Sequence, residues 1–383
     1  MKRIVLLCFA AVLAFVLGGC LGAASLDTLG YVSAIGFDKG ERQPYAVTML
    51  ILNTNMESDD QQSGGTTAVS TECGGLYEAI GVLSASLPYK LDLSRTMLIV
   101  LSAEVARDGA AALLGAPYGQ LRMRDNINLF VSTGSAEDAL KGMENDIVPN
   151  LHKMAADFAG FADETGLSVA VTRKDWLEAL SGGRFDAVLP VCGAKPEKHL
   201  PVPAVLSDGA YMGGYMAGSG GMKTSLSGAA VFSGDRLVCL LDGQHAMTLN
   251  MVQGTFRTGR VQAEVNGERM DVLLRRGGAP RIALTASAAP TVTVEVPLTL
   301  VPERQDGDPL ALCSALEATL TERAEKTFRF CRAFSADAFG FGRYAAKQFL
   351  YAPAWQAYGW RTRFPALTAT FRFTVTPVKE GAD

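Results

Sequence analysis

Apolar residues recur along this chain at two spacings, which together predict a mixture of strands and helices. In the first 145 residues, alternation every second residue or a short continuous apolar run predicts strands, and a period of three to four residues predicts helices. The strands are expected over 29–37, 45–53, 97–101 and 127–132, and the helices over 72–87, 103–114 and 135–141. This succession is typical of an α/β domain. The polar stretch 56–70 predicts an exposed loop.

Beyond residue 145 the pattern changes to a smaller, mostly helical unit. Helices are predicted over 150–164 and 172–180, and Thr172 with Asp175 three residues later forms a capping signal for the second helix. The unit closes on a strand-like stretch at 187–192. A run of Gly, Ser, Met and Tyr at 213–221 predicts a flexible connector.

The remaining chain predicts a sheet packed on one long helix. Strands are expected over 227–232, 237–241, 256–265, 268–275, 281–286, 292–300 and 368–376. The first two form a hairpin around a Ser-Gly-Asp turn, and the next four form an antiparallel meander with one wet face. Pro309 begins a helix whose apolar stripe runs to Cys331 at three- and four-residue steps. This stripe is expected to pack against the meander.

The predicted fold class is α/β to α+β, with mixed sheets, three domains, and a C-terminal antiparallel meander packed on a long helix. The expected divisions are a signal peptide at 1–19, a lipid-anchored tether at 20–25, an N-terminal α/β domain at 26–145, a small mostly helical middle domain with its connector at 146–222, and a C-terminal α+β domain at 223–383.

The N-terminus predicts export and anchoring. Lys2 and Arg3 precede an uncharged apolar run at 4–17, which is the length of a signal-peptide core and too short to span a bilayer. The residues that follow resemble the lipobox of bacterial lipoproteins: Leu17, Gly18, Gly19 and Cys20. That resemblance implies a diacylglycerol and an N-acyl lipid, with palmitate-type chains, on Cys20, and two or more acyl chains anchor a protein stably. An ordinary signal peptide with an incidental cysteine is the alternative.

Composition narrows the possible partners. The formal charge of −4, with both signs interspersed, argues against nucleic acid as a partner. Apolar stretches after the leader are only strand-sized. Outside the leader and Cys20 an odd number of widely spaced cysteines remains, which favours buried thiols over a disulfide framework. These are Cys73, Cys192, Cys239, Cys313 and Cys331.

Candidate catalytic and metal-binding groups are sparse. The three histidines, His152, His199 and His245, are not at ligand spacing from cysteines or carboxylates, so no metal site is predicted. Met222 separates Gly221 from Lys223, so the glycine-rich stretch does not form a phosphate-binding loop. No nucleophile elbow of the Gly-x-Ser-x-Gly type occurs.

Two sets of side chains still deserve a functional hypothesis. Asp38 and Glu104 could act with Asp337 as acid and base, but a turn role for Asp38 and a first-turn helix role for Glu104 explain them better. Trp355, Tyr358 and Trp360 could bind a sugar or a lipid head group, although aromatic residues are more commonly used in cores. We therefore predict no catalytic residues and no enzymatic activity.

Four further stretches contain motifs that recur together in one family. The first is an Ile-Gly-Phe-Asp-Lys-Gly strand end, and the second is a strand followed by a Glu-x-Ala-x-x-Gly helix. The third is the 226–241 hairpin, and the fourth is a Phe-Gly-x-Gly segment with tryptophans. The motif residues are Asp38, Gly40, Glu104, Gly109, Gly228, Phe232, Gly340, Gly342, Trp355 and Trp360. Together these stretches resemble the Ger(x)C family, the C subunits of spore germinant receptors. Ser94, Arg95 and Cys239 depart from the usual family pattern.

The resemblance implies a lipoprotein of sporulation and germination on the outer face of the spore inner membrane. It would work with an integral A subunit and a transporter-like B subunit that senses the germinant, and it implies neither catalysis nor a known small-molecule ligand. Two other functions stay open: a lipid-anchored solute-binding protein that feeds an importer, and an exported hydrolase of the spore cortex.

Overall fold

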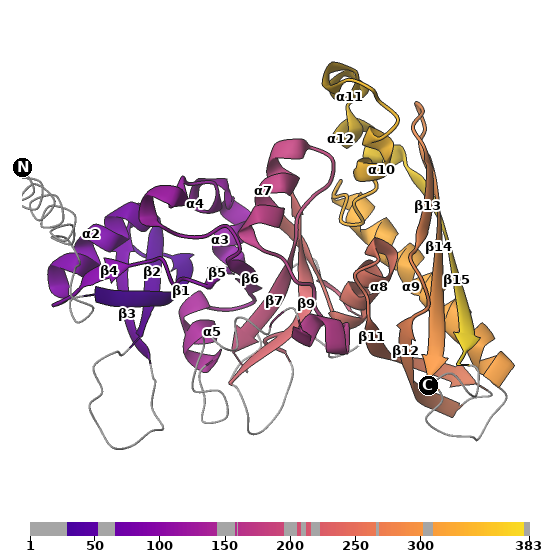
Figure 1. Cartoon of the computed structure of the whole chain (residues 1–383), viewed down its shortest axis with the longest axis horizontal. Coiled ribbons are helices and arrows are strands. Elements are labelled where there is room, and N and C mark those ends of the chain that lie inside the picture. Colours follow the sequence, from indigo (N-terminus) through magenta and orange to yellow (C-terminus); the bar gives the residue numbers. More distant parts are fainter. Residues whose placement is uncertain are drawn as a thin grey trace, which may run out of the picture.

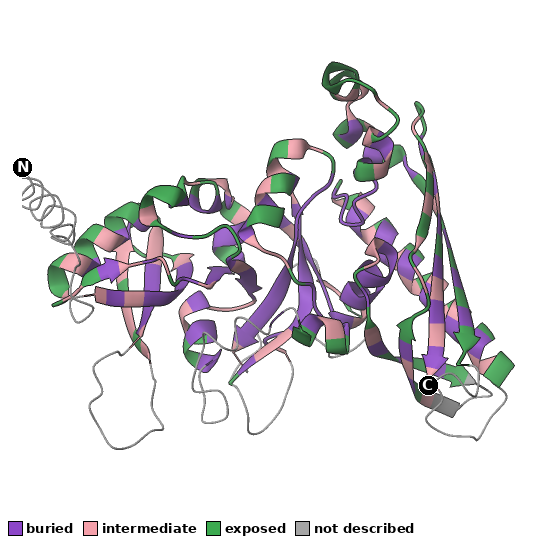
Figure 2. Cartoon of the chain, viewed as in Figure 1, coloured by how far each residue is buried: buried purple, intermediate pink, exposed green. Residues whose placement is uncertain are grey.

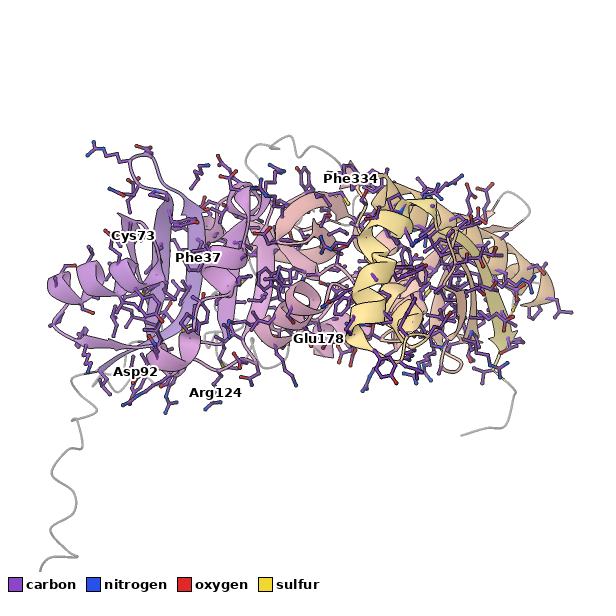
Figure 3. All side chains as sticks on the ribbon, turned by 90° about the horizontal axis from the view of Figure 1, so that it is seen from above. Phe37, Cys73, Asp92, Arg124, Glu178 and Phe334 are labelled. Atoms are coloured by element: carbon purple, nitrogen blue, oxygen red, sulfur yellow. The ribbon has the colours of Figure 1, made fainter. Side chains whose placement is uncertain are left out.

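The computed structural model describes residues 29–52, 66–143, 158, 160–194, 205–207, 212–215, 223–265, 268–301 and 309–378. The predicted leader and lipobox, and parts of the predicted 150–164 helix and 213–221 connector, lie outside the described residues. The described part forms an elongated body with two sheets next to each other along its long axis (Figure 1). Phe37 and Cys73 lie in its N-terminal half and Phe334 in its C-terminal half (Figure 3).

The larger sheet has ten strands in the order β3-β2-β1-β5-β6-β7-β9-β10-β8, with β4 also paired to β1. Its central strands β1, β5, β6 and β7 are parallel, and β2, β3, β9 and β10 join them antiparallel. The bounds are β1 (Leu29–Lys39), β2 (Tyr45–Leu52), β3 (Thr66–Cys73), β4 (Lys90–Asp92), β5 (Leu98–Ser102), β6 (Asn128–Ser132), β7 (Val188–Ala194), β8 (Val205–Leu206), β9 (Thr224–Ser233) and β10 (Arg236–Leu241).

The predicted strands of the first domain are confirmed, and two strands, β3 and the short β4, were missed. β5 is buried along its whole length, as its continuous apolar run predicts for a strand covered on both faces. β3 begins inside the stretch 56–70 that was predicted to be a loop, and it pairs with β2 along eight residues. This prediction was wrong at 66–70 because an edge strand faces water on much of its surface and so lacks the apolar alternation.

Helices cover both faces of the large sheet. One face carries α2 (Leu76–Ser86), α3 (Ala103–Asp108), α4 (Ala111–Leu114), the 3₁₀ turn η2 (Tyr118–Leu121) and α7 (Arg173–Gly182), and the opposite face carries α5 (Ala136–Met143). The capping box of Thr172 with Asp175 is confirmed, and Ser102 accepts a bond from the Val105 amide. The single helix predicted over 103–114 is instead two helices, because α3 ends at Gly109 with φ 124°.

The large sheet crosses both predicted domain boundaries. β7, from the predicted middle domain, pairs with β6, and β9, from the predicted C-terminal domain, pairs with β7. The points 145/146 and 222/223 therefore do not separate one sheet from another. Local spacing predicts where strands lie, but the partner of each strand depends on residues far away in the sequence.

The smaller sheet contains β11 (Thr258–Val265), β12 (Glu268–Arg276), β13 (Arg281–Thr285), β14 (Thr291–Val301) and β15 (Thr368–Pro377). The four predicted alternating strands and the closing strand are all present. Their order is not that of a simple meander, because β12 and β13 both pair with β14 and β15 runs parallel to it. The chain returns from β14 to β15 through a series of helices, and such a crossover connection produces parallel strands.

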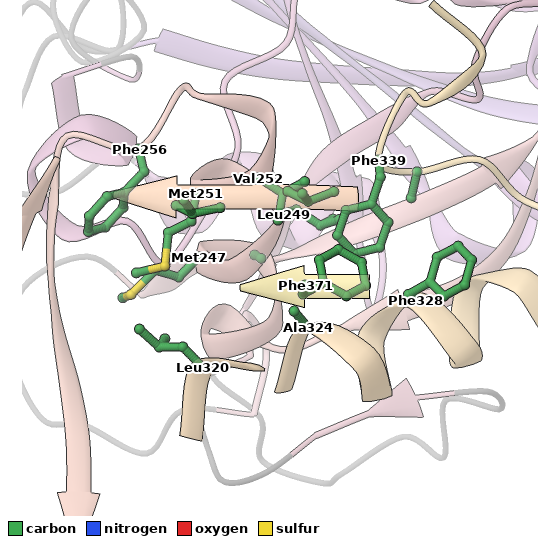
Figure 4. Packing of buried hydrophobic residues seen from close by; sticks show 14 of the residues in the cluster. Met247, Leu249, Met251, Val252, Phe256, Leu320, Ala324, Phe328, Phe339 and Phe371 are labelled. Carbon is green, nitrogen blue, oxygen red and sulfur yellow. The ribbon is translucent and has the colours of Figure 1, made fainter. Parts of the chain in front are cut away.

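A continuous apolar core joins the two sheets. α8 (Gly243–Gln253) lies between the large sheet and α9 (Pro309–Ala333), and nearly all its side chains are buried. The predicted stripe of α9 is buried from Cys313 to Cys331. Phe328 stands among the rings of Phe339, Phe341, Phe364 and Phe371, with centroid distances of 6.0–6.2 Å (Figure 4). The contacts of this core hold the smaller sheet against α8 and the large sheet.

The segment between α9 and β15 folds into short helices at one end of the smaller sheet. They are α10 (Gly342–Ala346), α11 (Ala352–Tyr358), α12 (Trp360–Arg363) and the 3₁₀ turn η3 (Phe364–Ala366). α11 buries none of its residues and projects from the body (Figures 1 and 2).

Candidate functional site

The turn between β9 and β10 brings together segments that are far apart in the sequence. The Gly234 amide donates to Asp186 Oδ1 at 2.8 Å, and the Asp235 carbonyl accepts from the Ala110 amide at 2.8 Å. At Gly109 a β-carbon would lie 2.9 Å from Asp235 Oδ2, and its φ of 124° also requires glycine. We call the residues Asp186, Gly234, Asp235, Asp337, Trp360 and Arg361 the hairpin junction.

Asp186 joins the hairpin to the C-terminal helices. Its side chain is 4% exposed, and its Oδ1 accepts from Gly234 and, at 2.9 Å, from the Arg361 guanidinium. Its Oδ2 accepts from the Asp337 amide at 2.9 Å. A buried carboxylate with three donors is well satisfied, so Asp186 fixes three segments relative to one another.

Asp337 is the second buried carboxylate of the junction. Its Oδ1 accepts from the Phe341 amide at 2.9 Å, and its Oδ2 accepts from the Gly342 amide at 2.7 Å and from the Trp360 indole Nε1 at 3.0 Å. Burial raises the pKa of Asp337 to about 7, although these three donors act in the opposite direction. All its acceptor atoms are therefore used inside the protein.

The Phe-Gly-x-Gly segment packs around the side chain of Asp337. A β-carbon on Gly342 would lie 2.0 Å from the Arg184 carbonyl oxygen and 2.4 Å from Trp360 Nε1, so only glycine fits. Gly340 lies in the turn that enters α10, where its amide donates to the Asp337 carbonyl at 3.2 Å. Both glycines thus serve the packing around Asp337.

Asp38 has a role that its position in the sequence does not reveal. It was predicted to act in the turn after β1, but its carboxylate accepts from the amides of Ala136 at 2.7 Å and Glu137 at 3.0 Å, and from the Ser135 hydroxyl. It therefore caps α5 from a distant strand. The Ser135 hydroxyl also accepts from the Asp138 amide, so a second side chain caps the first turn of α5. Burial raises the pKa of Asp38.

The other family-motif residues lie in structural positions. Gly40 is in the β1–β2 turn, and exposed Glu104 is in the first turn of α3, where the neighbouring Asp108 pairs with Lys39 of β1. The Gly228 amide donates to Leu167, and Phe232 is fully buried. Half-buried Trp355 lies 6.3 Å from the ring of buried Trp360. The prediction that the tryptophans belong to the core holds for Trp360 and only partly for Trp355.

No catalytic constellation is assembled among the described residues. Asp38 and Asp337 bind different elements, and Glu104 is exposed on a third. His245 contacts Thr327 through Nδ1 at 2.7 Å, whereas His152 and His199 lie outside the described residues. Within the described ranges no group of three or more His, Cys, Asp or Glu side chains is placed to hold a metal ion.

A cavity of about 220 Å³ lies beside the hairpin junction. Its acidic lining residues are engaged with other parts of the protein: Asp163 with Arg257, Asp175 with the Thr172 cap, and Asp186 with the junction. The guanidinium of Arg343, which also lines it, lies 3.5 Å from the centre of the Phe185 ring. The polar groups of this cavity are thus used to hold the fold.

Sequence reasoning missed the residues that organise the junction. Asp186, Asp235 and Arg361 stand in loops or short helices next to ordinary turn residues, and no local pattern distinguishes them. The tryptophan at 360, next to Arg361, is the one feature that draws attention to this segment, and it does not show which residue Arg361 contacts.

Two family profiles match this chain. Residues 22–194 match a spore germination protein N-terminal domain, and residues 227–379 match the family described as spore germination B3/GerAC like, C-terminal. Among solved structures, the chain is similar to the crystal structure of the GerBC protein, with a TM-score of 0.53, 13% identity, and coverage of 90% of this chain and 97% of that one. This similarity supports the mixed α/β fold. A search of curated proteins returned no match. Within the described ranges no helix is long and apolar enough to cross a membrane.

Proposed function

Because the chain belongs to the Ger(x)C family of spore germination proteins, we propose that it is the C subunit of a nutrient germinant receptor and acts by protein–protein contact with the membrane A and B subunits. The observation that carries the proposal is that the two family profiles together span nearly all of the body. The motif residues within that span serve the fold instead of forming a reactive site, which favours a role as a binding partner.

The proposed mechanism depends on a lipid anchor at Cys20. Acylation there would hold the body at the outer face of the spore inner membrane through a short tether. Modest interfaces with the A and B subunits would then be nearly intramolecular, because a short tether raises the effective concentration of the two partners. The proposal needs no cofactor beyond the lipid itself.

A substitution at the anchor tests this proposal. Spores that carry Cys20→Ala should respond more slowly to nutrients, while Cys73→Ala, which removes a buried thiol and leaves the predicted lipobox intact, serves as the control. Germination is measured as loss of spore refractility, and immunoblots of membrane and soluble fractions show where each variant resides. A normal response from an unanchored Cys20→Ala protein would contradict the proposal.

The two alternatives give different results in simple assays. A solute-binding protein usually has two similar lobes, whereas the two sheets here differ in size and strand order. A true ligand at a hundredfold excess over its dissociation constant would stabilise the protein by about 2.7 kcal/mol, which a thermal-shift screen detects. A cortex hydrolase would release soluble fragments from peptidoglycan, and the described residues offer no acid and base pair for it.

A further inference from the structure

The tip formed by residues 348–358 is apolar, uncharged and exposed. Leu350 is 90% exposed and Tyr351 is 72% exposed, and α11, which follows them directly, buries none of its residues. The eleven residues of this tip contain no Asp, Glu, Lys or Arg. The tip projects from the top of the body, where Figure 2 shows it almost entirely as exposed surface.

The base of the tip is firmly held. The ring of Phe349 lies 4.9 Å from that of Tyr358 and 5.7 Å from that of Trp355. The Tyr358 hydroxyl donates to the Ser287 carbonyl at 3.0 Å, and the Gln348 side chain bonds to Leu284 and Ala286. The β13–β14 turn that receives these bonds is also uncharged from 282 to 294. The exposed apolar side chains therefore stand on a rigid support.

The chain segment that contains the tip carries only basic charges. Residues 338–378 contain five basic side chains and no acidic one, although the whole chain has a net charge of −4. The five are Arg343, Lys347, Arg361, Arg363 and Arg372. Lys347 is exposed immediately before the tip, and the Arg363 guanidinium lies 4.9 Å from the centre of the Tyr358 ring, so positive charge borders the aromatic base.

We propose that the 348–358 tip docks into the surface of an anionic phospholipid membrane. Leu350 and Tyr351 enter the boundary between head groups and acyl chains, and Trp355 and Tyr358 lie at head-group level. The basic side chains nearest the tip, Lys347 and Arg363, face lipid phosphates. Aromatic residues with a basic rim suit this interface, because the rings are amphipathic and the anionic surface attracts cations. The contact rests on neither the proposed receptor role nor acylation of Cys20.

The position of Trp355 relative to lipid provides the test. The other two tryptophans are buried, with Trp176 1% and Trp360 3% exposed, so brominated acyl chains report mainly on Trp355. The purified full chain is mixed with brominated phosphatidylglycerol vesicles or with brominated phosphatidylcholine vesicles. We expect quenching in the anionic vesicles that is at least fivefold greater than in the zwitterionic ones, and Trp355→Phe should remove it.

Matched variants separate the tip from other membrane contacts. Leu350→Asp and Tyr351→Asp should each weaken the quenching about tenfold or more, because an apolar side chain that enters the membrane is replaced by a negative charge. Leu310→Asp, at an apolar residue 71% exposed on α9, is the control and should have no effect. Lys347→Gln should weaken binding roughly fivefold, since a cation near an anionic surface contributes about 1 kcal/mol.

Three outcomes would overturn the proposal. The first is that lipid alone does not quench Trp355, which would favour a protein partner for the tip. The second is that anionic and zwitterionic vesicles quench Trp355 equally. The third is that Leu310→Asp loses as much quenching as the tip variants. None of them depends on germination, so a failure here is distinguishable from a failure of the proposed receptor function.

Discussion

Asp337 accepts a hydrogen bond from the indole nitrogen of Trp360, which lies 23 residues further along the chain, at 3.0 Å. Both side chains are buried, so the tryptophan of the family motif satisfies a carboxylate and does not present a binding platform. This bond closes α12 onto the segment before α10. The same segment reaches the large sheet through Asp186, so the Asp337–Trp360 pair contributes to the orientation of the two sheets.

The pKa of Asp337 predicts how stability depends on pH. Burial raises this pKa to about 7, above the usual value near 3.9 in an unfolded chain, so the folded state binds more protons between these two values. The contribution of Asp337 to the free energy of unfolding should therefore fall as pH rises from about 4 to about 7 and then level off.

Chemical denaturation of the wild type and of Asp337→Asn at several pH values checks this expectation. Asparagine turns an NH₂ group towards the donors, which should cost about 1–3 kcal/mol at pH 5. The difference between the two proteins should narrow towards pH 7, because only the wild type loses stability through this group. A difference that stays constant between pH 5 and pH 7 would show that the carboxyl group is ionised throughout, and would contradict the raised pKa.

Gly342→Ala should destabilise the protein severely. The added methyl group would overlap the Arg184 carbonyl and the Trp360 indole, both of them held by the junction, so we expect a loss of about 3 kcal/mol or more. Gly81→Ala is the matched control, because Gly81 lies exposed in α2 with no atom within 4 Å of the new β-carbon. That substitution should stabilise by about 0.5–1 kcal/mol. Urea denaturation measures both.

The two partners of the Asp186–Arg361 ion pair should respond unequally. Asp186→Ala leaves the buried amide of Asp337 and the partly buried amide of Gly234 without an acceptor and should cost about 2–4 kcal/mol. Arg361→Ala should cost only about 1 kcal/mol, because the Arg361 side chain is 50% exposed and Asp186 keeps its two backbone donors. Equal losses in thermal or urea unfolding would contradict this account of the junction.

Asp38→Ala should weaken α5 although Asp38 lies nearly a hundred residues before it. Loss of the acceptor for the Ala136 and Glu137 amides should cost about 1–2 kcal/mol. Hydrogen exchange at these amides should accelerate, while Asp138→Ala, in an exposed acidic residue of the same turn, should leave it nearly unchanged. Unchanged exchange of the Ala136 and Glu137 amides in Asp38→Ala would contradict the capping role of Asp38.

The described cysteines should resist modification until the protein unfolds. All five are free and buried. A hydrogen bond with Cys239 and burial hold the pKa of Cys331 well above its usual range, and burial alone raises that of Cys192. Alkylation with iodoacetamide, mapped by mass spectrometry, should label these positions only in denaturant. Rapid labelling of native Cys331, or a Cys313–Cys331 disulfide, would be inconsistent with this arrangement.

Local signals in the sequence sufficed wherever an element is governed by its own residues. Thr172 and Asp175 form their capping box within one turn, and the stripe of α9 follows from the helical period. The same reasoning failed at β3, whose polar Thr and Ser residues are strand-forming only because β2 pairs with them. It also failed at Gly109, where the close approach of Asp235 ends a helix that the apolar pattern would have continued.

The sequence by itself determined the mixed α/β class, most strands and helices, and the family, because propensity, periodicity and motif residues are local properties of the chain. Tertiary structure alone decided that ten strands from three predicted domains form one sheet, that β15 runs parallel to β14, and that Asp38, Asp186 and Asp337 bind distant amides. These features depend on which segments meet in space, and a buried carboxylate finds its donors only after the chain has packed.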